Sequence, residues 1–508
     1  MPASTSGGST HPVVLPNEQA TRRLARDIAL ALEPGDLVTL SGDLGAGKTT
    51  FARALIRTLA DDPAIEVPSP TFTLLQSYEL PRFPVVHGDL YRVSRPGELD
   101  ELGLDDLPPG AVTLLEWPDR AAGLLPPDRL DIAFTLAPQL GSEHRDVLIT
   151  GHGGFAPRAE RIAAARRFLD ANELGEAERA RLAGDASARS YERLAFAGHR
   201  LILMNSPRRT DGPPVRRGLP YSAIAHLAED VQPFVAIASG LRERGFSAPA
   251  IYASDLAAGF LVLEDLGDEG VVAGDPPAPL AERYQTGVDV LVALHRLTLP
   301  DTLPVAPSVS HRIPRYDLDA LLIEAELLPD WYLPHRGAAG VDRGAYAALW
   351  RDALAPLLDA PPTWVLRDFH SPNLLWLPER SGIGRIGLLD FQDAVIGPAA
   401  YDLASLLQDA RVDVTADMEV ELLGHYVRAR SEGERKFDVP GFVRIYSTLA
   451  AQRASKILGI FARLNHRDRK PQYLRHLPRV WGYLQRSLAH PDLAALAAWY
   501  RAHVPPPG

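Results

Sequence analysis

The stretch "SGDLGAGKTT", residues 41–50, follows a short apolar run, "DLVTL", and precedes "FARALIRTLA", whose apolar residues recur at helical spacing. It fits the pattern G-x-x-x-x-G-K-[ST] with Gly42, Gly47, Lys48 and Thr49. In such a loop, backbone N–H groups and the start of the next helix surround phosphate groups. The strand before the loop and the helix after it are the context that the motif requires. We therefore predict an ATP-binding P-loop.

The same motif predicts how ATP and Mg²⁺ would be held. Lys48 would reach the β- and γ-phosphates, and the Thr49 hydroxyl would bind Mg²⁺. The metal also needs a carboxylate at the end of a neighbouring strand, and Asp89 in "PVVHGD" and Glu116 in "VTLLE" both qualify as Mg²⁺ ligands or water-positioning groups. The nucleotide-binding residues predicted in the loop are Gly42, Gly45, Gly47, Lys48, Thr49 and Thr50.

Elements on both sides of the loop indicate a parallel α/β sheet. Asn17 is a plausible N-cap, and Leu24, Ile28 and Leu32 follow at helical spacing until "EPGD" stops the helix. After the loop, "FPVVHGD" and "AVTLLEW" are two short apolar runs. Alternation of buried strands with helices is typical of a parallel sheet.

Four motifs in this order, "SGDLGAGKTT", "VPSPTFTLLQSYE", "HGDLYR" and "LLEWPDR", make residues 11–150 resemble the TsaE family. These are small ATPases that assist bacterial synthesis of threonylcarbamoyladenosine in tRNA. The resemblance implies that Thr71 belongs to a switch-like segment near the γ-phosphate and that Trp117 lies near the nucleotide. It also implies that Asp89 and Glu116 surround Mg²⁺. The implied partner is a TsaB–TsaD complex, with largely indirect tRNA contact.

Composition limits the remaining possibilities. A chain of 508 residues is expected to form two to four domains. The net charge of −11 argues against a broad nucleic-acid-binding surface. Because there is no cysteine, disulfides, thiolate metal sites and cysteine nucleophiles are excluded. We see neither a signal peptide nor a run of 18 apolar residues, so we expect a cytoplasmic protein without membrane contact.

A change of composition at "GHGGFAPRAE" predicts a linker over residues 151–163. The remaining residues, 164–508, begin with strand-like segments and continue with long helical ones. That order predicts a two-lobed α+β domain with a small lobe at about 164–267 and a large lobe at about 268–508.

The most informative stretch of this second domain is "WVLRDFHSPNLLWLPERSGIGRIGLLDFQD". Asn373 opens the strand "NLLWL", and "RIGLLD" returns after a turn and ends at Asp390. In a hairpin the start of one strand faces the end of the other, so Asn373 and Asp390 would lie at the same end, beside Asp368. Phosphoryl transfer uses such a set: Asp368 as the base for an acceptor hydroxyl, and Asn373 and Asp390 as Mg²⁺ ligands.

The pattern resembles the aminoglycoside-phosphotransferase superfamily, relatives of protein kinases that phosphorylate small molecules. Arg367-Asp368 stands where that superfamily usually has His-Asp, and Asp390 takes the place of the aspartate in the kinase Asp-Phe-Gly motif. In "GPAAYDLASLL" we expect Asp402 to be structural, and in "VLVALHRL" we expect His295 to be a core histidine.

The predicted small lobe departs from the kinase pattern. "GDASARSYERL" would be the turn that covers the nucleotide, and "LVLEDLGD" the hinge, where the backbone at Glu264 and Leu266 would bind adenine. A kinase normally has a lysine on the strand after that turn, but "HRLILMN" offers Met204. Three alternatives are open for the positive charge of the absent lysine. An arginine such as Arg189 or Arg193 supplies it, this subgroup of kinases works without it, or the domain is an inactive pseudokinase.

"GDASARSYERL", "RDFHSPNLLW" and "LLDFQDAVIGPAAYDLASLLQDAR" look most like AmgK-type sugar kinases, over about residues 160–500. The resemblance implies phosphorylation of the C1 hydroxyl of N-acetylmuramate and N-acetylglucosamine in cell-wall (peptidoglycan) recycling, with Asp409 and Arg411 reaching the sugar. We therefore predict a bifunctional protein: a TsaE-type ATPase joined to a sugar 1-kinase. Alternatively, the second domain phosphorylates another alcohol, such as an aminoglycoside, choline or a ribose derivative, or it is a non-catalytic regulator of the tRNA-modifying complex.

Overall fold

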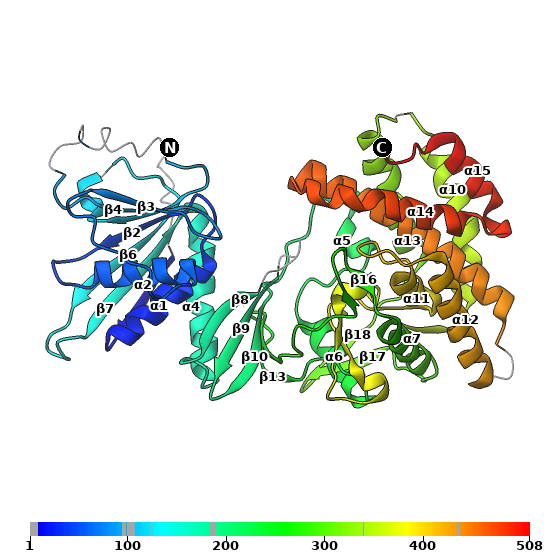
Figure 1. Ribbon diagram of the computed structural model, residues 1–508, viewed down its shortest axis with the longest axis horizontal. Coiled ribbons are helices and arrows are strands. Elements are labelled where there is room, and N and C mark those ends of the chain that lie inside the picture. Colours follow the sequence, from blue (N-terminus) through cyan, green and yellow to red (C-terminus); the bar gives the residue numbers. More distant parts are fainter. Residues whose placement is uncertain are drawn as a thin grey trace. The chain divides into compact units, whose positions relative to one another are not determined.

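The structure is a computed structural model that describes residues 9–93, 98, 107–121, 123–182, 189–338, 340–433 and 437–508. The chain forms two compact units, which divide between Asn205 and Ser206. Figure 1 shows the helices and strands coloured along the sequence. The turn predicted to cover the nucleotide of the second domain, "GDASARSYERL", lies partly outside the described residues.

A seven-stranded sheet in the order β1-β7-β6-β2-β5-β4-β3 forms the centre of unit 1. Strands β4, β5, β2 and β6 are parallel neighbours, whereas β3, β7 and β1 are antiparallel additions at the two edges. The predicted parallel α/β sheet is therefore confirmed. The strands are β1 Ser9–Leu15, β2 Leu37–Ser41, β3 Leu75–Tyr78, β4 Val85–Asp89, β5 Val112–Glu116, β6 Arg129–Leu136 and β7 Arg145–His152.

Helices α1 (Glu18–Ala31) and α2 (Lys48–Ala60) share one apolar core with this sheet. Asn17 caps α1 as predicted, because its side-chain oxygen accepts a hydrogen bond of 2.9 Å from the N–H of Ala20. Fully buried Ile28 of α1 and Phe51 of α2 belong to the same cluster as the strand residues. This packing fixes the P-loop between β2 and α2.

The linker predicted over residues 151–163 is wrong. These residues complete β7 and then form the first half of α4 (Ala156–Ala171), whose buried face joins the core of the first sheet through Ala159 and Ile162. Gly151 permits this close packing, because a Cβ at that position would lie 2.7 Å from the Cβ of Ala159. Gly151 of "GHGG" therefore marks tight helix–sheet contact, a cause that composition does not distinguish from flexibility.

Beyond α4, three antiparallel strands complete unit 1: β8 Glu178–Leu182, β9 Ser190–Phe196 and β10 His199–Asn205. Arg179 on β8 ties them to α1, because its guanidinium pairs with the buried carboxylate of Asp27 and also with Glu192 at 2.6 Å. Arg166 on α4 bonds the same Asp27 carboxylate at 2.6 Å. These charge pairs explain why the compact unit extends well past the boundary predicted at residue 164.

Unit 2 is mainly helical, with several two-stranded pairs. Phe391, after the second strand of the hairpin β20–β21, stacks on Phe234 of α6 with 4.9 Å between ring centroids. No described helix of the protein combines the length and the apolar run needed to cross a membrane. The principal elements of unit 2 are α5 Tyr221–Ile224, α6 Gln232–Glu243, β13 Ile251–Asp255, β14 Phe260–Glu264, α7 Ala281–His295, α8 Leu318–Ala325, α10 Arg343–Leu354, β19 Pro362–Val365, β20 Leu374–Trp376, β21 Ile386–Leu388, β22 Val395–Pro398, α11 Ala400–Leu407, α12 Ala416–Gly433, α13 Val439–Asp468, α14 Leu477–Leu488 and α15 Ala494–His503.

Replacing Gly151 with alanine should loosen α4 from the sheet. The added Cβ would meet Ala159 at 2.7 Å and the Cα of Ala156 at 2.8 Å, so we expect a loss of about 1–3 kcal/mol in unfolding free energy. Amide hydrogen exchange should rise across residues 156–171. Gly154→Ala is the matched control, because its nearest neighbour, Asp128, lies 3.6 Å away. Equal exchange in both variants would contradict this account of α4.

Candidate functional sites

The P-loop joins the end of β2 to the start of α2, and its glycines are required by the backbone. Gly42 has a φ of 132°, and a Cβ there would lie 2.4 Å from the carbonyl oxygen of Phe134. Gly45 and Gly47 have φ values of 77° and 109°, which side-chain-bearing residues rarely adopt. The loop thus has the tight shape that the motif predicts.

Lys48 is nearly buried, and its ammonium contacts the loop itself. Its Nζ donates to the carbonyl oxygens of Gly42 at 2.7 Å and Asp43 at 2.9 Å. The same ammonium lies 3.8 Å from the centre of the Trp117 ring. Burial lowers the pKa of Lys48, although the carboxylates of Glu116 and Asp89 oppose this shift. The positive charge is therefore held in a low-dielectric site where it would interact strongly with an anion.

The two predicted carboxylates lie side by side, because Asp89 of β4 and Glu116 of β5 are register partners on parallel strands. The hydroxyl of Thr49 donates to Glu116 Oε2 at 3.1 Å. The hydroxyl of Thr71 donates to Asp89 Oδ2 at 2.9 Å. Glu116 thus adjoins the P-loop threonine, and Asp89 adjoins the predicted switch-like segment.

Two further residues complete this site, and sequence reasoning missed both. Nε2 of fully buried His87 lies 3.0 Å from Glu116 Oε1 and fixes that carboxylate. Arg145, at the start of β7, donates from Nε to the carbonyl oxygen of Ala46 at 3.1 Å and so holds the P-loop from outside. His87 lies in the quoted motif "HGDLYR" and could have been singled out, whereas Arg145 has no local signal because its partner is 99 residues away.

In unit 2 the predicted hairpin is confirmed. β20 and β21 are antiparallel, and the N–H of Leu389 donates to the carbonyl oxygen of Asn373 at 2.9 Å. This bond places Asn373 and Asp390 at the same end of the hairpin. The Asn373 amide donates to the carbonyl oxygen of Asp368 at 3.0 Å, and Gln392 donates to Asp390 Oδ1 at 2.9 Å. The three predicted residues are therefore linked around one end of the hairpin.

Asp402 holds the backbone beneath the predicted base, which agrees with the structural role expected from the sequence. Its carboxylate is fully buried and accepts hydrogen bonds from the N–H groups of Leu366 at 2.6 Å and Arg367 at 2.8 Å. Burial raises the pKa of Asp402 to about 7, although these two bonds act in the opposite direction. The loop is thus fixed one residue before Asp368.

The side chain of Arg367 enters a buried cluster of charges centred on Glu324 of α8. Its guanidinium pairs with one oxygen of that carboxylate, which also accepts from Lys456 of α13 at 2.7 Å. Tyr316 donates to the other oxygen. Burial alone would raise the pKa of Glu324, but Lys456 and Arg367 outweigh it and lower the pKa to about 2. Glu324 and Lys456 were not singled out from the sequence, because their partners lie far along the chain.

The charge on Asp368 depends on these neighbours. Partial burial would raise its pKa, but the positive charges around it, above all His370, Lys456 and Arg367, outweigh burial and lower the pKa. The Asp368 carboxylate is therefore ionised at neutral pH and available to accept a proton or a hydrogen bond.

The predicted sugar contact of Asp409 is not favoured by its position. The carboxylate is fully buried, and its oxygens accept from the N–H groups of Ser371 at 2.7 Å and Arg411 at 2.8 Å. These bonds connect the loop after Asp368 to the segment that follows α11. We therefore assign Asp409 a positioning role, and the prediction for Arg411 stays untested.

Three other predictions concern residues at the edges of the site. His295 is a core histidine as expected: it is buried, its Nδ1 lies 2.8 Å from the Tyr426 hydroxyl, and burial lowers its pKa to about 3. Met204 is buried in β10, and no measurement on the described residues identifies a substitute for the absent lysine. At the predicted hinge, the N–H of Glu264 donates to Ala250, so adenine binding by Glu264 and Leu266 stays a prediction.

Two family models match this chain. The one described as "Threonylcarbamoyl adenosine biosynthesis protein TsaE" matches residues 15–145, and the one described as "Phosphotransferase enzyme family" matches residues 178–440. An N-acetylmuramate/N-acetylglucosamine kinase of Caulobacter vibrioides is 40% identical over 363 residues, which are 68% of this chain and 98% of that protein. A kinase of the same name from Pseudomonas aeruginosa is 32% identical and covers 64% of this chain and 88% of its own. A tRNA threonylcarbamoyladenosine biosynthesis protein TsaE of Rickettsia bellii is 40% identical over 123 residues, 24% of this chain and 85% of that protein.

Replacing Glu324 with glutamine should destabilise unit 2 at neutral pH. The change leaves Arg367 and Lys456 as buried charges without their carboxylate, at a cost of about 3–5 kcal/mol. Because the folded-state pKa of Glu324 is lowered from 4.5 to about 2, its contribution is complete above 4.5 and declines as the pH falls toward 2. Urea unfolding of both proteins should therefore show a difference that shrinks below pH 4.5.

Glu326→Gln is the matched control, because Glu326 pairs with Arg216 in a partly exposed position. Its cost should stay within about 1 kcal/mol. A Glu324→Gln cost as small as that of the control would contradict the central role of this cluster.

Proposed function

Since this chain belongs to the TsaE family in its first part and to the phosphotransferase enzyme family in its second, as the motifs predicted, we propose that it carries two separate ATP-dependent chemistries. The second part would phosphorylate the C1 hydroxyl of N-acetylmuramate and N-acetylglucosamine. The first would be an ATPase that supports threonylcarbamoyladenosine synthesis in tRNA. Both chemistries use ATP, which supports the cytoplasmic location expected from the sequence.

The observation that carries the kinase proposal is the meeting of Asp368, Asn373 and Asp390 at one end of the β20–β21 hairpin. Asp368 would accept the proton of the sugar hydroxyl. Its lowered pKa keeps the carboxylate ionised but makes it a weak base. The main contribution of Asp368 would therefore be to orient the hydroxyl by accepting its hydrogen bond. This suits phosphoryl transfer, in which catalysis rests mainly on positioning and on stabilising charge. Asp402 and Asp409 would keep the loop in place from both sides.

The residues present fit ATP and Mg²⁺. The described residues contain no group of three or more His, Asp or Glu side chains suited to hold a metal by themselves. Mg²⁺ usually takes only one or two carboxylates together with substrate phosphates and water. Asn373 and Asp390 offer such a partial set in unit 2, and Thr49 with Glu116 offers another in unit 1. Bound Mg²⁺ would neutralise phosphate charge at both sites.

In the ATPase proposal, the loop N–H groups and Lys48 would bind the phosphates. Glu116 would hold the metal with Thr49, to which it is already bonded. Asp89 would respond to the nucleotide through Thr71, since the two side chains are bonded at 2.9 Å. Trp117, which covers the Lys48 ammonium, would close one side of the phosphate site.

The partner of the ATPase part would be a TsaB–TsaD complex, as the family resemblance implies. Contact with tRNA would then be largely indirect. The net charge of −11 supports indirect contact, because proteins that bind tRNA directly usually carry an excess of basic residues.

Two single substitutions should separate the activities. Asp368→Ala should abolish formation of sugar 1-phosphate from ATP and N-acetylglucosamine while ATP hydrolysis by unit 1 continues. Lys48→Ala should remove that ATP hydrolysis and leave sugar phosphorylation unchanged, because the Lys48 ammonium is bonded to its own loop and lies over Trp117, all within unit 1. Phosphorus NMR would identify the sugar 1-phosphate, and release of inorganic phosphate without sugar would measure hydrolysis.

Other outcomes would change the assignment. Full sugar-kinase activity of Asp368→Ala would refute the proposed base. Loss of both activities in Lys48→Ala would show that the two parts work only together. Turnover with choline, an aminoglycoside or a ribose derivative in place of the amino sugars would identify a different acceptor, and no turnover with any of them would favour a regulatory second domain.

A further inference from the structure

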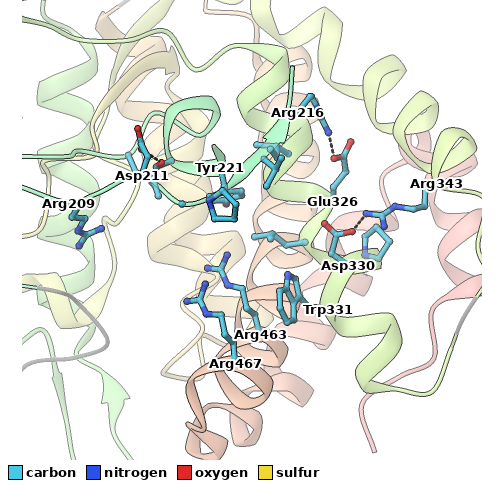
Figure 2. A pocket seen from close by; sticks show the side chains of 18 of the residues that line it. Arg209, Asp211, Arg216, Tyr221, Glu326, Asp330, Trp331, Arg343, Arg463 and Arg467 are labelled. Carbon is cyan, nitrogen blue, oxygen red and sulfur yellow. Dashed lines mark hydrogen bonds and ion pairs between the residues drawn. The ribbon is translucent and has the colours of Figure 1, made fainter. Parts of the chain in front are cut away.

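Unit 2 contains a cavity of about 920 Å³ on which the proposed mechanism does not draw (Figure 2). Its walls come from the segment 209–229, from the end of α8 with the turn after it, from the start of α10 and from the last turns of α13. A volume of this size is ample for a sugar-sized ligand.

Most charges in the cavity wall neutralise one another. Glu326 pairs with Arg216, and Asp330 pairs with Arg343, as the dashed lines in Figure 2 show. Asp211 accepts a hydrogen bond of 2.7 Å from Ser222. The carboxylates of the wall are thus engaged within the protein and leave little negative charge for a cationic ligand.

Arg463 is different. Its Nε atom is buried and, within the described part of the chain, has no hydrogen-bond partner. The ring of Tyr221 lies 5.6 Å from its guanidinium carbon. Arg467, one helical turn further along α13, extends parallel to Arg463 toward the same side of the cavity (Figure 2). Arg467 is itself bonded to Asp468 at 2.7 and 3.0 Å, so the unpartnered buried donor of Arg463 is the group that favours an anion here.

The electrostatics of Arg463 support this conclusion. Burial lowers its pKa, the phenol of Tyr221 opposes that shift, the charge of Arg467 lowers the pKa further, and the carboxylate of Asp468 raises it. Arginine does not give up its proton in proteins, so the buried guanidinium of Arg463 keeps its charge and would be stabilised by an anion that approaches it.

The cavity lies next to the charge cluster behind Asp368. Its wall includes Ile323 and Glu326, which flank Glu324 in sequence. The segment 221–229 of the wall bonds to the catalytic region twice: the carbonyl oxygen of Ala225 accepts from Arg367 at 2.8 Å, and the N–H of Ala228 donates to Asp393 at 2.7 Å. Arg463 itself stands two turns, about 10 Å, beyond Lys456 on α13.

We propose that this cavity receives the acidic arm of the acceptor sugar, with the Arg463 guanidinium binding its carboxylate. The inference rests on the proposed sugar-kinase function. N-acetylmuramate is N-acetylglucosamine with a lactyl ether that ends in a carboxylate, so the two sugars differ in the one group that Arg463 would recognise. Arg463 is then the residue that distinguishes an acidic from a neutral amino sugar.

The test compares the two sugars on one variant. For Arg463→Gln we expect the KM for N-acetylmuramate to rise on the order of 10- to 100-fold, as expected for losing a charge-assisted bond. The kcat should change little, and the KM for N-acetylglucosamine should stay within about twofold. Arg463→Lys, which keeps the charge without the planar fork, should recover part of the loss. Retained turnover of N-acetylglucosamine demonstrates that each variant is folded.

A binding measurement separates failure of this inference from failure of the proposed function. Calorimetric titration of the full chain with N-acetylmuramate should show the same weakening in Arg463→Gln whether or not the sugar is phosphorylated. If neither sugar is turned over but this weakening is seen, the kinase proposal falls and the carboxylate site stands. The inference would be overturned if Arg463→Gln weakened the binding of both sugars equally, or if it left the binding of N-acetylmuramate unchanged. Weaker binding of inorganic phosphate by Arg463→Gln with unchanged N-acetylmuramate binding would overturn it as well.

Discussion

Glu324 places its carboxylate in the interior of unit 2, where one oxygen accepts from both Arg367 and Lys456 and the other accepts from Tyr316. A fully buried carboxylate is tolerated only when opposite charges and hydrogen bonds replace the water it has lost. The cluster therefore requires α8, the loop after β19 and α13 to come together in one arrangement. Since Asp368 follows Arg367 directly, the position of the predicted base depends on that requirement.

The same cluster sets the electrostatics of the predicted base. Together with His370, Lys456 and Arg367 lower the pKa of Asp368, and the carboxylate of Asp402 accepts a hydrogen bond from the backbone N–H of Arg367. Structure and charge are thus controlled by the same few groups. In unit 1 the two carboxylates are positioned by the sheet alone. Asp89 and Glu116 are the last residues of two adjacent parallel strands and are register partners.

Features that depend on local sequence were predictable, and features that depend on distant contacts were not. The P-loop, the cap at Asn17 and the hairpin that joins Asn373 to Asp390 follow from neighbouring residues. Gly151 was misinterpreted as part of a linker because its function is the close approach of Ala159, which composition does not reveal. The sugar contact predicted for Asp409 rests on the family resemblance, whereas its hydrogen bond from the N–H of Ser371, 38 residues earlier, could not be predicted from local sequence.

The scarcity of lysine gives a last argument about the two sites. The chain has 53 basic residues but only four lysines, and two of these, Lys48 and Lys456, lie in the two sites. An ammonium is a compact charge with three donors, whereas a guanidinium is a planar fork with five. Lys48 fits between two loop carbonyls and the face of Trp117, and Lys456 fits between Glu324 and the hydroxyl of Tyr401 at 3.4 Å. A broader guanidinium would have buried donors left without partners in either place, which explains why lysine stands there in a chain whose basic residues are mostly arginine.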